Sequence, residues 1–375
     1  MKITILALHL GYGGIEKFIS NIANMFAKDN DVEIISIYKL YDKPPFYIDQ
    51  NVKITYLLEG MKPNRDEFYK SIKSFNIVEF IKQSFISAKI LYLKKHAMKK
   101  AIKNLKSDVV ISTIPPHNKL LSKYGNKEMK KIATEHNYKE GDKRYISGVI
   151  KSCSSMDYLV IASKKLSNMY SEKMSNKKCN VVNIPLGIDY MPNKVSKLDK
   201  KIITYMGRLS EEKGVIDLID IFKKVHNKDN EFILNIVGDG DLKDKLIEKI
   251  RNYQLENNVV LHGYKTKSES EDILLDTSIG INTSYTESFG LAIIETFSYG
   301  VPCVAFDSAE GATEIIDDGE NGYIIGERKF DEMADKIIKL MENNKKIKQF
   351  GKNARKKSSQ FKSERIRLEW DKLLQ

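Results

Sequence analysis

The sequence predicts an α/β protein built from two doubly wound, Rossmann-like domains. Its 375 residues are more than one hydrophobic core usually organises, so two domains are expected. Lys2–Leu8 is an apolar run typical of a buried parallel strand, and a glycine turn then opens a helical pattern. Ile202–Met206 begins a second series of strands in the same way. We expect residues 1–184 to form the first domain, 185–200 a hinge linker and 201–360 the second domain.

Apolar runs and helical periodicity place the remaining elements in chain order. Further strands are expected at 32–38, 52–57, 108–114, 131–134, 158–162, 180–184, 231–237 and 258–261. Helices are expected at 77–105, 164–174, 331–343, 345–357 and 364–374. Two prolines should end the strand at 108–114.

The composition bounds the class of protein. A hydrophobic content of 42% fits a soluble globular chain. The three cysteines, Cys153, Cys179 and Cys303, are too far apart for a local metal site and too few for a disulfide framework, so core packing is their expected role. No apolar run reaches about 18 residues, and the N-terminus lacks a signal-peptide pattern. We therefore expect a cytoplasmic protein.

The charge is very unevenly distributed. Residues 1–185 carry 32 Lys and Arg against 17 Asp and Glu, whereas residues 186–375 carry 30 against 33. The first half should therefore attract an anionic partner. No zinc-finger spacing, aromatic RNA-binding motif or arginine-rich element is present, so nucleic acid is not expected. Anionic lipid headgroups, at the inner face of the cell membrane, fit at least as well.

Much of this positive charge belongs to the helix expected at 77–105. One side is apolar, with Ile90, Leu93, Ala97, Ala101 and Leu105. Lysines occupy the rest of the circumference at positions 94, 95, 99, 100, 103 and 106. A basic amphipathic helix can lie on a membrane surface. An ordinary helix with a solvated lysine face explains the pattern equally well, and both interpretations stay open.

A glycine loop follows the first strand. Gly11, Gly13 and Gly14 turn the chain into a helix, which lets backbone approach a phosphate. A Rossmann dinucleotide site is the rival interpretation. It is disfavoured because the third glycine of that fingerprint would fall at Glu16, and the strand at 32–38 ends without a ribose-binding acid.

Histidines follow the ends of several strands in the first half. His136 comes just after the strand at 131–134, and ligands of open parallel sheets bind at that edge. His117 and His9 are secondary candidates. A lone histidine is more often a hydrogen-bonded loop residue than a catalytic one.

The most informative stretch is Thr286–Phe306, TESFGLAIIETFSYGVPCVAF, interpreted as loop, helix, turn and strand. Ser288 is the expected N-cap of a helix starting near Gly290, whose N-terminus favours an anion. Glu287 and Glu295 would line one pocket and accept hydrogen bonds from hydroxyls, which suits a nucleotide-sugar. An amphipathic helix with one solvated glutamate is about as compatible with the periodicity alone.

Two further patterns follow strands of the second half. Arg208 and Lys213 place two cations after the strand at 202–206, as a diphosphate would need. Surface ion pairs with Glu211 or Glu212 are the alternative. Asp239-Gly240-Asp241 resembles an Asp-x-Asp metal motif, but a glycine turn with Asp241 as N-cap explains it.

Thr286–Phe306 is similar to the E-x7-E signature of retaining family 4 glycosyltransferases. That family has the GT-B fold, in which two doubly wound domains face each other across a cleft. The resemblance implies that Glu287 contacts the donor sugar and Glu295 holds the nucleotide ribose. It also implies that backbone amides of Phe289, Gly290 and Leu291 meet the sugar and phosphate.

The resemblance extends to other segments. It implies that Arg208 and Lys213 bind the donor diphosphate. Thr134-Glu135-His136-Asn137 resembles the family's histidine motif, so His136 would face the sugar. The remaining implied donor-binding positions are Gly13 and Gly14 beside the phosphate and Gly263 and Tyr264 around the base. In this fold the last helix, here 361–375, crosses back to the first domain.

The resemblance implies a retaining glycosyltransferase that needs no metal. The donor would be a nucleotide-sugar, with UDP as the usual nucleotide, carrying a hexose or N-acetylhexosamine. The acceptor would be a saccharide or lipid-linked saccharide in the synthesis of capsule, another cell-surface polysaccharide or glycolipid. The alternatives are a two-domain Rossmann dehydrogenase and a non-catalytic, lysine-rich protein that binds membrane or nucleic acid.

Overall fold

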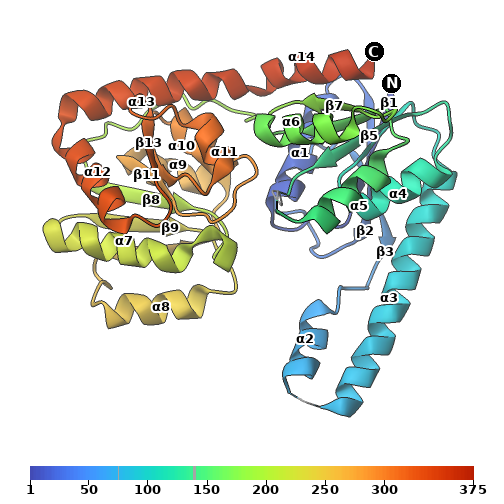
Figure 1. Cartoon of the computed structure of the whole chain (residues 1–375), viewed down its shortest axis with the longest axis horizontal. Coiled ribbons are helices and arrows are strands. Elements are labelled where there is room, and N and C mark those ends of the chain that lie inside the picture. Colours follow the sequence, from blue (N-terminus) through green and yellow to red (C-terminus); the bar gives the residue numbers. More distant parts are fainter. Residues whose placement is uncertain (75, 138–140) are drawn as a thin grey trace. The chain divides into compact units, whose positions relative to one another are not determined.

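The computed structural model describes residues 1–74, 76–137 and 141–375, which form two compact units (Figure 1). Unit 1 comprises Met1–Ile161, Lys165–Asn183 and Asp371–Gln375, and unit 2 comprises Ala162–Lys164 and Ile184–Trp370. The stretch 185–200, expected as a linker, is grouped with unit 2. Within the described ranges, no helix combines the length and apolar character needed to cross a membrane.

Unit 1 is built on a parallel sheet of seven strands in the order β3-β2-β1-β4-β5-β6-β7. The strands are β1 (Lys2–Ala7), β2 (Asp31–Tyr38), β3 (Lys53–Leu58), β4 (Val109–Ser112), β5 (Lys130–Glu135), β6 (Tyr158–Ile161) and β7 (Asn180–Asn183). Strands β1, β2 and β4 are almost wholly buried, as apolar runs in a sheet covered on both faces should be. The strand order reverses between β1 and β4, where open parallel sheets bind ligands.

The helices described beside this sheet are α1 (Gly14–Phe26), α2 (Arg65–Lys73), α3 (Ile77–Lys103), α4 (Pro115–Tyr124), α5 (Lys143–Cys153) and α6 (Lys164–Met174). The two prolines after β4 do more than end a strand, because they begin α4. Proline suits the first helical positions, where the missing N–H has no intrahelical acceptor.

The long helix α3 begins at the predicted Ile77 and ends at Lys103 rather than Leu105, and its buried side coincides only in part with the predicted apolar side. The structure buries Ile90, Met98 and Ile102, while Leu93 and Ala97 stay partly exposed. The difference arises because the C-terminal half of α3 packs on β2, β3 and α4, and this surface selects the side that carries Met98 and Ile102.

Unit 2 contains a parallel sheet of six strands in the order β10-β9-β8-β11-β12-β13. The strands are β8 (Ile202–Met206), β9 (Ile233–Val237), β10 (Val259–Gly263), β11 (Ile279–Asn282), β12 (Cys303–Phe306) and β13 (Gly322–Ile325). The order reverses between β8 and β11, which pair directly. The same rule therefore directs attention to the loops after these two strands.

The helical segments of the second half are η1 (Glu211–Lys213), α7 (Val215–Lys228), α8 (Lys243–Asn252), α9 (Lys267–Asp276), α10 (Leu291–Ser298), α11 (Glu310–Ile315), α12 (Phe330–Glu342), α13 (Asn344–Ser358), η2 (Ser359–Phe361) and α14 (Ser363–Leu374). The prediction that Asp241 caps α8 is wrong, because the turn after β9 extends further and Leu242 is the N-cap.

Candidate active site

The predicted cations and the first glutamate of unit 2 lie on adjacent loops. Arg208 and Lys213 follow β8, and Glu287 follows β11, at the carboxyl edge where the strand order reverses. Lys213 Nζ lies 2.6 Å from Glu287 Oε2, and the two side chains are 23% and 16% exposed. Lys213 therefore pairs with Glu287 rather than with the neighbouring Glu211 or Glu212. Arg208 is exposed at the same edge.

A glycine lets these two loops approach closely. Gly214 has a φ of 62°, and a Cβ built on it would lie 2.1 Å from the carbonyl oxygen of Thr283. The Thr283 hydroxyl donates to the Lys213 carbonyl at 3.0 Å, and the Tyr285 N–H donates to the Glu212 carbonyl at 2.9 Å. The segments carrying Lys213 and Glu287 are thus one hydrogen-bonded substructure.

The helix α10 begins at Leu291, and its N-cap is Gly290 rather than the predicted Ser288. Gly290 has a φ of 97°, a conformation that favours glycine. The phenyl group of Phe289 is buried, so a contact from this residue to a ligand would use its backbone. The first N–H groups of a helix have no intrahelical acceptor. Glu295 lies on the second turn and is partly buried.

The loops after β8, β9 and β10 are also connected. The Leu209 N–H donates to the Asp239 carbonyl at 3.0 Å, and the Gly238 N–H donates to the Gly263 carbonyl at 2.8 Å. Gly263 has a φ of 67° and precedes the exposed Tyr264. The predicted base-binding pair therefore lies on the same hydrogen-bonded edge as Arg208.

Sequence reasoning missed Arg328, which follows β13. Its Nη1 donates to the Thr283 carbonyl at 2.9 Å and lies 3.1 Å from Asp217 Oδ2. The guanidinium carbon is 3.3 Å from the Tyr285 ring centroid, a cation–π contact. Its φ of 58° is uncommon for a residue with a side chain, so these contacts hold a strained backbone. Arg328 thereby positions the segment that leads to Glu287.

In unit 1, the glycine loop and His136 are connected through α1. Gly13 is the N-cap of α1, which starts at Gly14. The ring of Phe18 on this helix lies 4.5 Å from the His136 ring, centroid to centroid. Thr134 Oγ1 is 2.7 Å from His136 Nε2. Burial lowers the pKa of His136 to about 4, so its imidazole is neutral at pH 7.

The carboxylate of Glu135, which sequence reasoning left without a role, holds the backbone around His136. Its Oε1 accepts hydrogen bonds from the N–H groups of His136 at 2.9 Å and Asn137 at 2.7 Å, and from the Tyr145 hydroxyl at 3.0 Å. Burial raises the pKa of Glu135 above its ordinary value. In the sequence, its position next to His136 was the one indication that Glu135 supports the site.

The two secondary histidine candidates make contacts that support the fold. His117 lies inside α4 and is buried, and burial together with the charge of Lys94 lowers its pKa to about 3. His9 Nδ1 lies 3.3 Å from Glu16 Oε1 and 3.2 Å from the Gly11 nitrogen, so this side chain organises the glycine loop.

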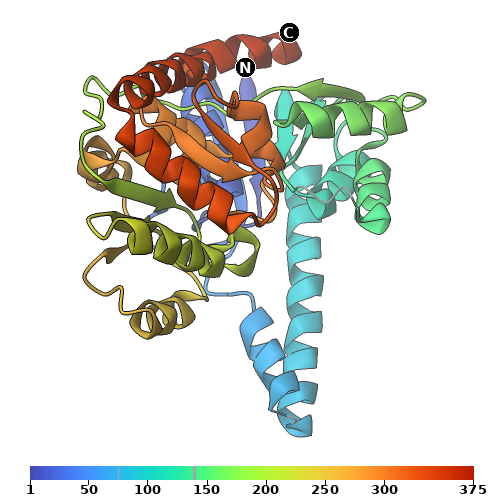
Figure 2. The ribbon, with the colours of Figure 1, turned by 60° about the vertical axis from the view of Figure 1, so that its left-hand side comes forward.

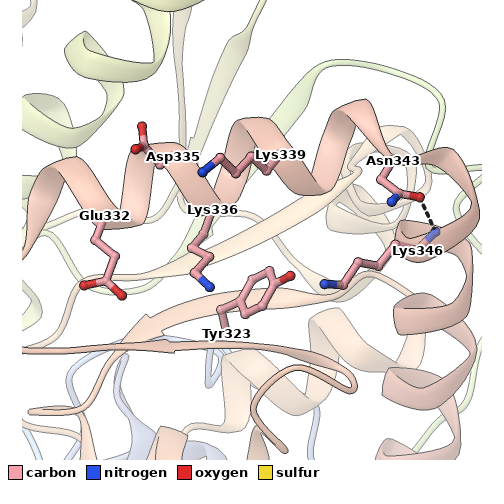
Figure 3. A pocket seen from close by; sticks show the side chains of 7 residues that line it. All are labelled: Tyr323, Glu332, Asp335, Lys336, Lys339, Asn343 and Lys346. Atoms are coloured by element: carbon pink, nitrogen blue, oxygen red, sulfur yellow. Dashed lines mark hydrogen bonds between the residues drawn. The ribbon is translucent and has the colours of Figure 1, made fainter.

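A surface hollow in unit 2 lies away from the predicted site residues (Figure 3). It is bordered by Tyr323 on β13 and by polar residues of α12 and α13. Lys336 and Lys346 lie over the Tyr323 ring at 4.7 and 5.3 Å from its centroid. These cation–π contacts explain the position of both lysines, and no bound ligand is needed to explain it.

Two doubly wound parallel sheets, each carrying predicted site residues at its carboxyl edge, define a protein of the GT-B fold. Comparison with known proteins agrees with this class. Residues 189–357 match the model of the family described as glycosyl transferases group 1.

Two relatives are named as transferases that act on polymers. An exopolysaccharide phosphotransferase of Streptomyces coelicolor is 26% identical over 383 residues, covering 100% of this chain and 40% of the relative. A poly(ribitol-phosphate) α-N-acetylglucosaminyltransferase of Staphylococcus aureus is 35% identical over 172 residues, covering 46% of this chain and 34% of the relative. The chain thus spans well under half the length of either relative.

A crystal structure of a Staphylococcus aureus TarM mutant, in complex with fondaparinux, α-GlcNAc-glycerol and UDP, resembles the whole chain. The TM-score is 0.78 at 18% sequence identity, with 100% of each chain covered. At this identity the likeness establishes the fold.

Proposed function

We propose that the chain is a retaining glycosyltransferase that moves a hexose or N-acetylhexosamine from a UDP-sugar to a saccharide or lipid-linked acceptor. The observation that carries this proposal is the contact between Lys213 and Glu287 at the carboxyl edge of unit 2. A cation suited to a diphosphate and a carboxylate suited to sugar hydroxyls meet there, next to the N-terminus of α10.

In this proposal the leaving diphosphate is stabilised by Arg208, Lys213 and the first N–H groups of α10. Such groups act on charge that develops as the bond to the sugar breaks, as an oxyanion hole does. Glu295 accepts hydrogen bonds from the ribose, and Gly263 and Tyr264 accompany the base. None of these roles calls for a metal ion.

The sugar is oriented by carboxylate and imidazole groups. Glu287 accepts hydrogen bonds from the sugar hydroxyls, and the neutral His136 of unit 1, whose Nε2 bonds to Thr134 Oγ1, offers its other ring nitrogen. Glu295, the second carboxylate of the predicted site, is assigned to the ribose, so the proposal includes no nucleophile for a covalent intermediate. We therefore propose front-side attack with retention, in which a phosphate oxygen of the donor takes the proton of the acceptor hydroxyl.

The names of the relatives support a cell-surface polymer, such as capsule or teichoic acid, as the product class. The positive charge of residues 1–185 supports an anionic membrane surface as a partner at which a lipid-linked acceptor is reached. The protein would then act in the cytoplasm, peripherally on the inner face of the membrane.

A thermal-shift experiment separates this proposal from its rivals. UDP should raise the melting temperature, because a ligand at 100 times its Kd stabilises the folded state by about 2.7 kcal/mol. NAD and an oligonucleotide serve as ligands for the dehydrogenase and nucleic-acid alternatives. A shift with either of them and none with UDP would overturn the proposal. Hydrolysis of a panel of UDP-sugars then identifies the donor.

A further inference from the structure

The helices α2 and α3 of unit 1 lie side by side (Figure 2), with α2 covering one face of α3. Asn64 Nδ2, at the start of α2, donates to the Gln83 carbonyl at 3.2 Å and to Ser87 Oγ at 3.0 Å. Phe68 of α2 contacts Phe80, with ring centroids 5.7 Å apart. One side of the N-terminal half of α3 therefore packs against α2 within unit 1.

A second side of the same half-helix is apolar and exposed. We call it the apolar stripe and define it as Ile77, Val78, Ile81, Phe85 and Tyr92, which are 73%, 78%, 50%, 74% and 67% exposed. Apart from Val78, steps of four or seven residues place its members in line along one side of the helix. A helix that is apolar on two sides calls for a partner on each, and contiguous exposed apolar surface marks interaction sites.

Basic residues continue the stripe. One turn beyond Tyr92, the same side carries Lys95 and then Lys99. Residues 62–106 hold 12 lysines and arginines against three acidic residues. This charge indicates which partner covers the apolar stripe. A second copy of the same helix pair would bring like charges together, whereas an anionic lipid surface is complementary in charge.

We propose that the apolar stripe inserts into the boundary between headgroups and acyl chains of an anionic bilayer, while the lysines of α3 bind the headgroups. A helix with this division of apolar and basic residues lies in the membrane interface rather than across it. The inference rests on the membrane partner included in the proposed function and is independent of the transfer chemistry.

The cysteines allow a direct test of insertion. Cys153, Cys179 and Cys303 are all buried, so one introduced surface cysteine can be labelled selectively. Full-length Phe85→Cys carrying an environment-sensitive dye should brighten and shift to the blue with phosphatidylglycerol–phosphatidylcholine vesicles. The control is Leu368→Cys, an exposed site on α14, whose dye should not respond.

A binding measurement complements the dye. Because each methylene buried in the bilayer changes partition by about fourfold, the variant I77S/I81S/F85S should lose vesicle sedimentation by about tenfold or more. The matched control V260S/L368S removes exposed apolar side chains elsewhere and should sediment like the wild type. The variant K95Q/K100Q should bind more weakly but keep a salt-resistant component.

Three outcomes would overturn the proposal: unchanged sedimentation of I77S/I81S/F85S, a silent dye at position 85, or no vesicle binding by the wild type. The last outcome, with a wild-type dimer that the same substitutions dissociate, would identify a second copy as the occupant. UDP-sugar hydrolysis is measured alongside. Its absence from the wild type would contradict the proposed function, whereas its persistence in a variant that no longer binds vesicles leaves that function standing.

Discussion

The contact between Lys213 and Glu287 predicts that removing one charge strengthens nucleotide binding. The substitution Glu287→Gln keeps the side-chain shape but removes the charge that lies 2.6 Å from Lys213 Nζ. Exposed ion pairs contribute up to about 1 kcal/mol, whereas breaking a fully buried pair costs about 3–5 kcal/mol. With side chains 16% and 23% exposed, the value here should be about 1–2 kcal/mol.

A diphosphate that draws Lys213 away from Glu287 must overcome this attraction. Glu287→Gln should therefore lower the Kd for UDP by about 5- to 30-fold, while sugar transfer falls because a hydroxyl acceptor is lost. Lys213→Met should act in the opposite direction and raise the Kd for UDP. The opposite signs distinguish competition for one lysine from a general loss of the fold.

Isothermal titration of UDP into both variants and the double variant at fixed salt measures these changes. Glu211→Gln, an exposed residue on the same loop but outside the pair, is the matched control. An unchanged or higher Kd for Glu287→Gln would refute the reasoning, because Lys213 would then bind phosphate and Glu287 together or would not contact UDP.

The other predictions concern separate groups. Glu295→Ala should weaken UDP binding by about 1.5–3 kcal/mol without altering the circular dichroism spectrum, and an unchanged Kd would refute the ribose assignment. Arg208→Met should lower kcat by about 100-fold. A change in KM alone would mean that Arg208 binds the substrate and the transition state equally well. The buried His117, with its pKa lowered to about 3, binds a proton more readily in the unfolded chain. Between pH 6.5 and 3 the free energy of unfolding should therefore fall by about 1.4 kcal/mol per pH unit from this group. Urea unfolding of His117→Gln should show a flatter pH dependence than the wild type.

Strands were predictable because burial on both faces of a parallel sheet leaves continuous apolar runs. Lys2–Leu8 became β1 (Lys2–Ala7), and the run at 202–206 became β8 without change. The helix α2 was not predicted, since its sequence is largely polar and it buries Ser71 alone. Local sequence patterns were thus enough to predict an element where that element is regular and apolar.

The residues that support the site could not be predicted, because their contacts cross long stretches of sequence. Arg328 contacts the carbonyl of Thr283, 45 residues earlier, and belongs to no motif. The cap of α10 was assigned to Ser288 by composition, whereas the positive φ of Gly290 determines where the helix starts. Backbone conformation and distant partners become visible in the folded chain.

The close approach of Gly214 to Thr283 has a consequence for engineering donor specificity. A Cβ at position 214 would lie 2.1 Å from the Thr283 carbonyl oxygen and 3.3 Å from Arg328 Nη1, which donates to the same carbonyl. A loop transplanted from a relative after β8 would therefore meet a mismatched neighbour after β11. Chimaeras that exchange donor preference should move both loops together with the residue at 328, as one cassette.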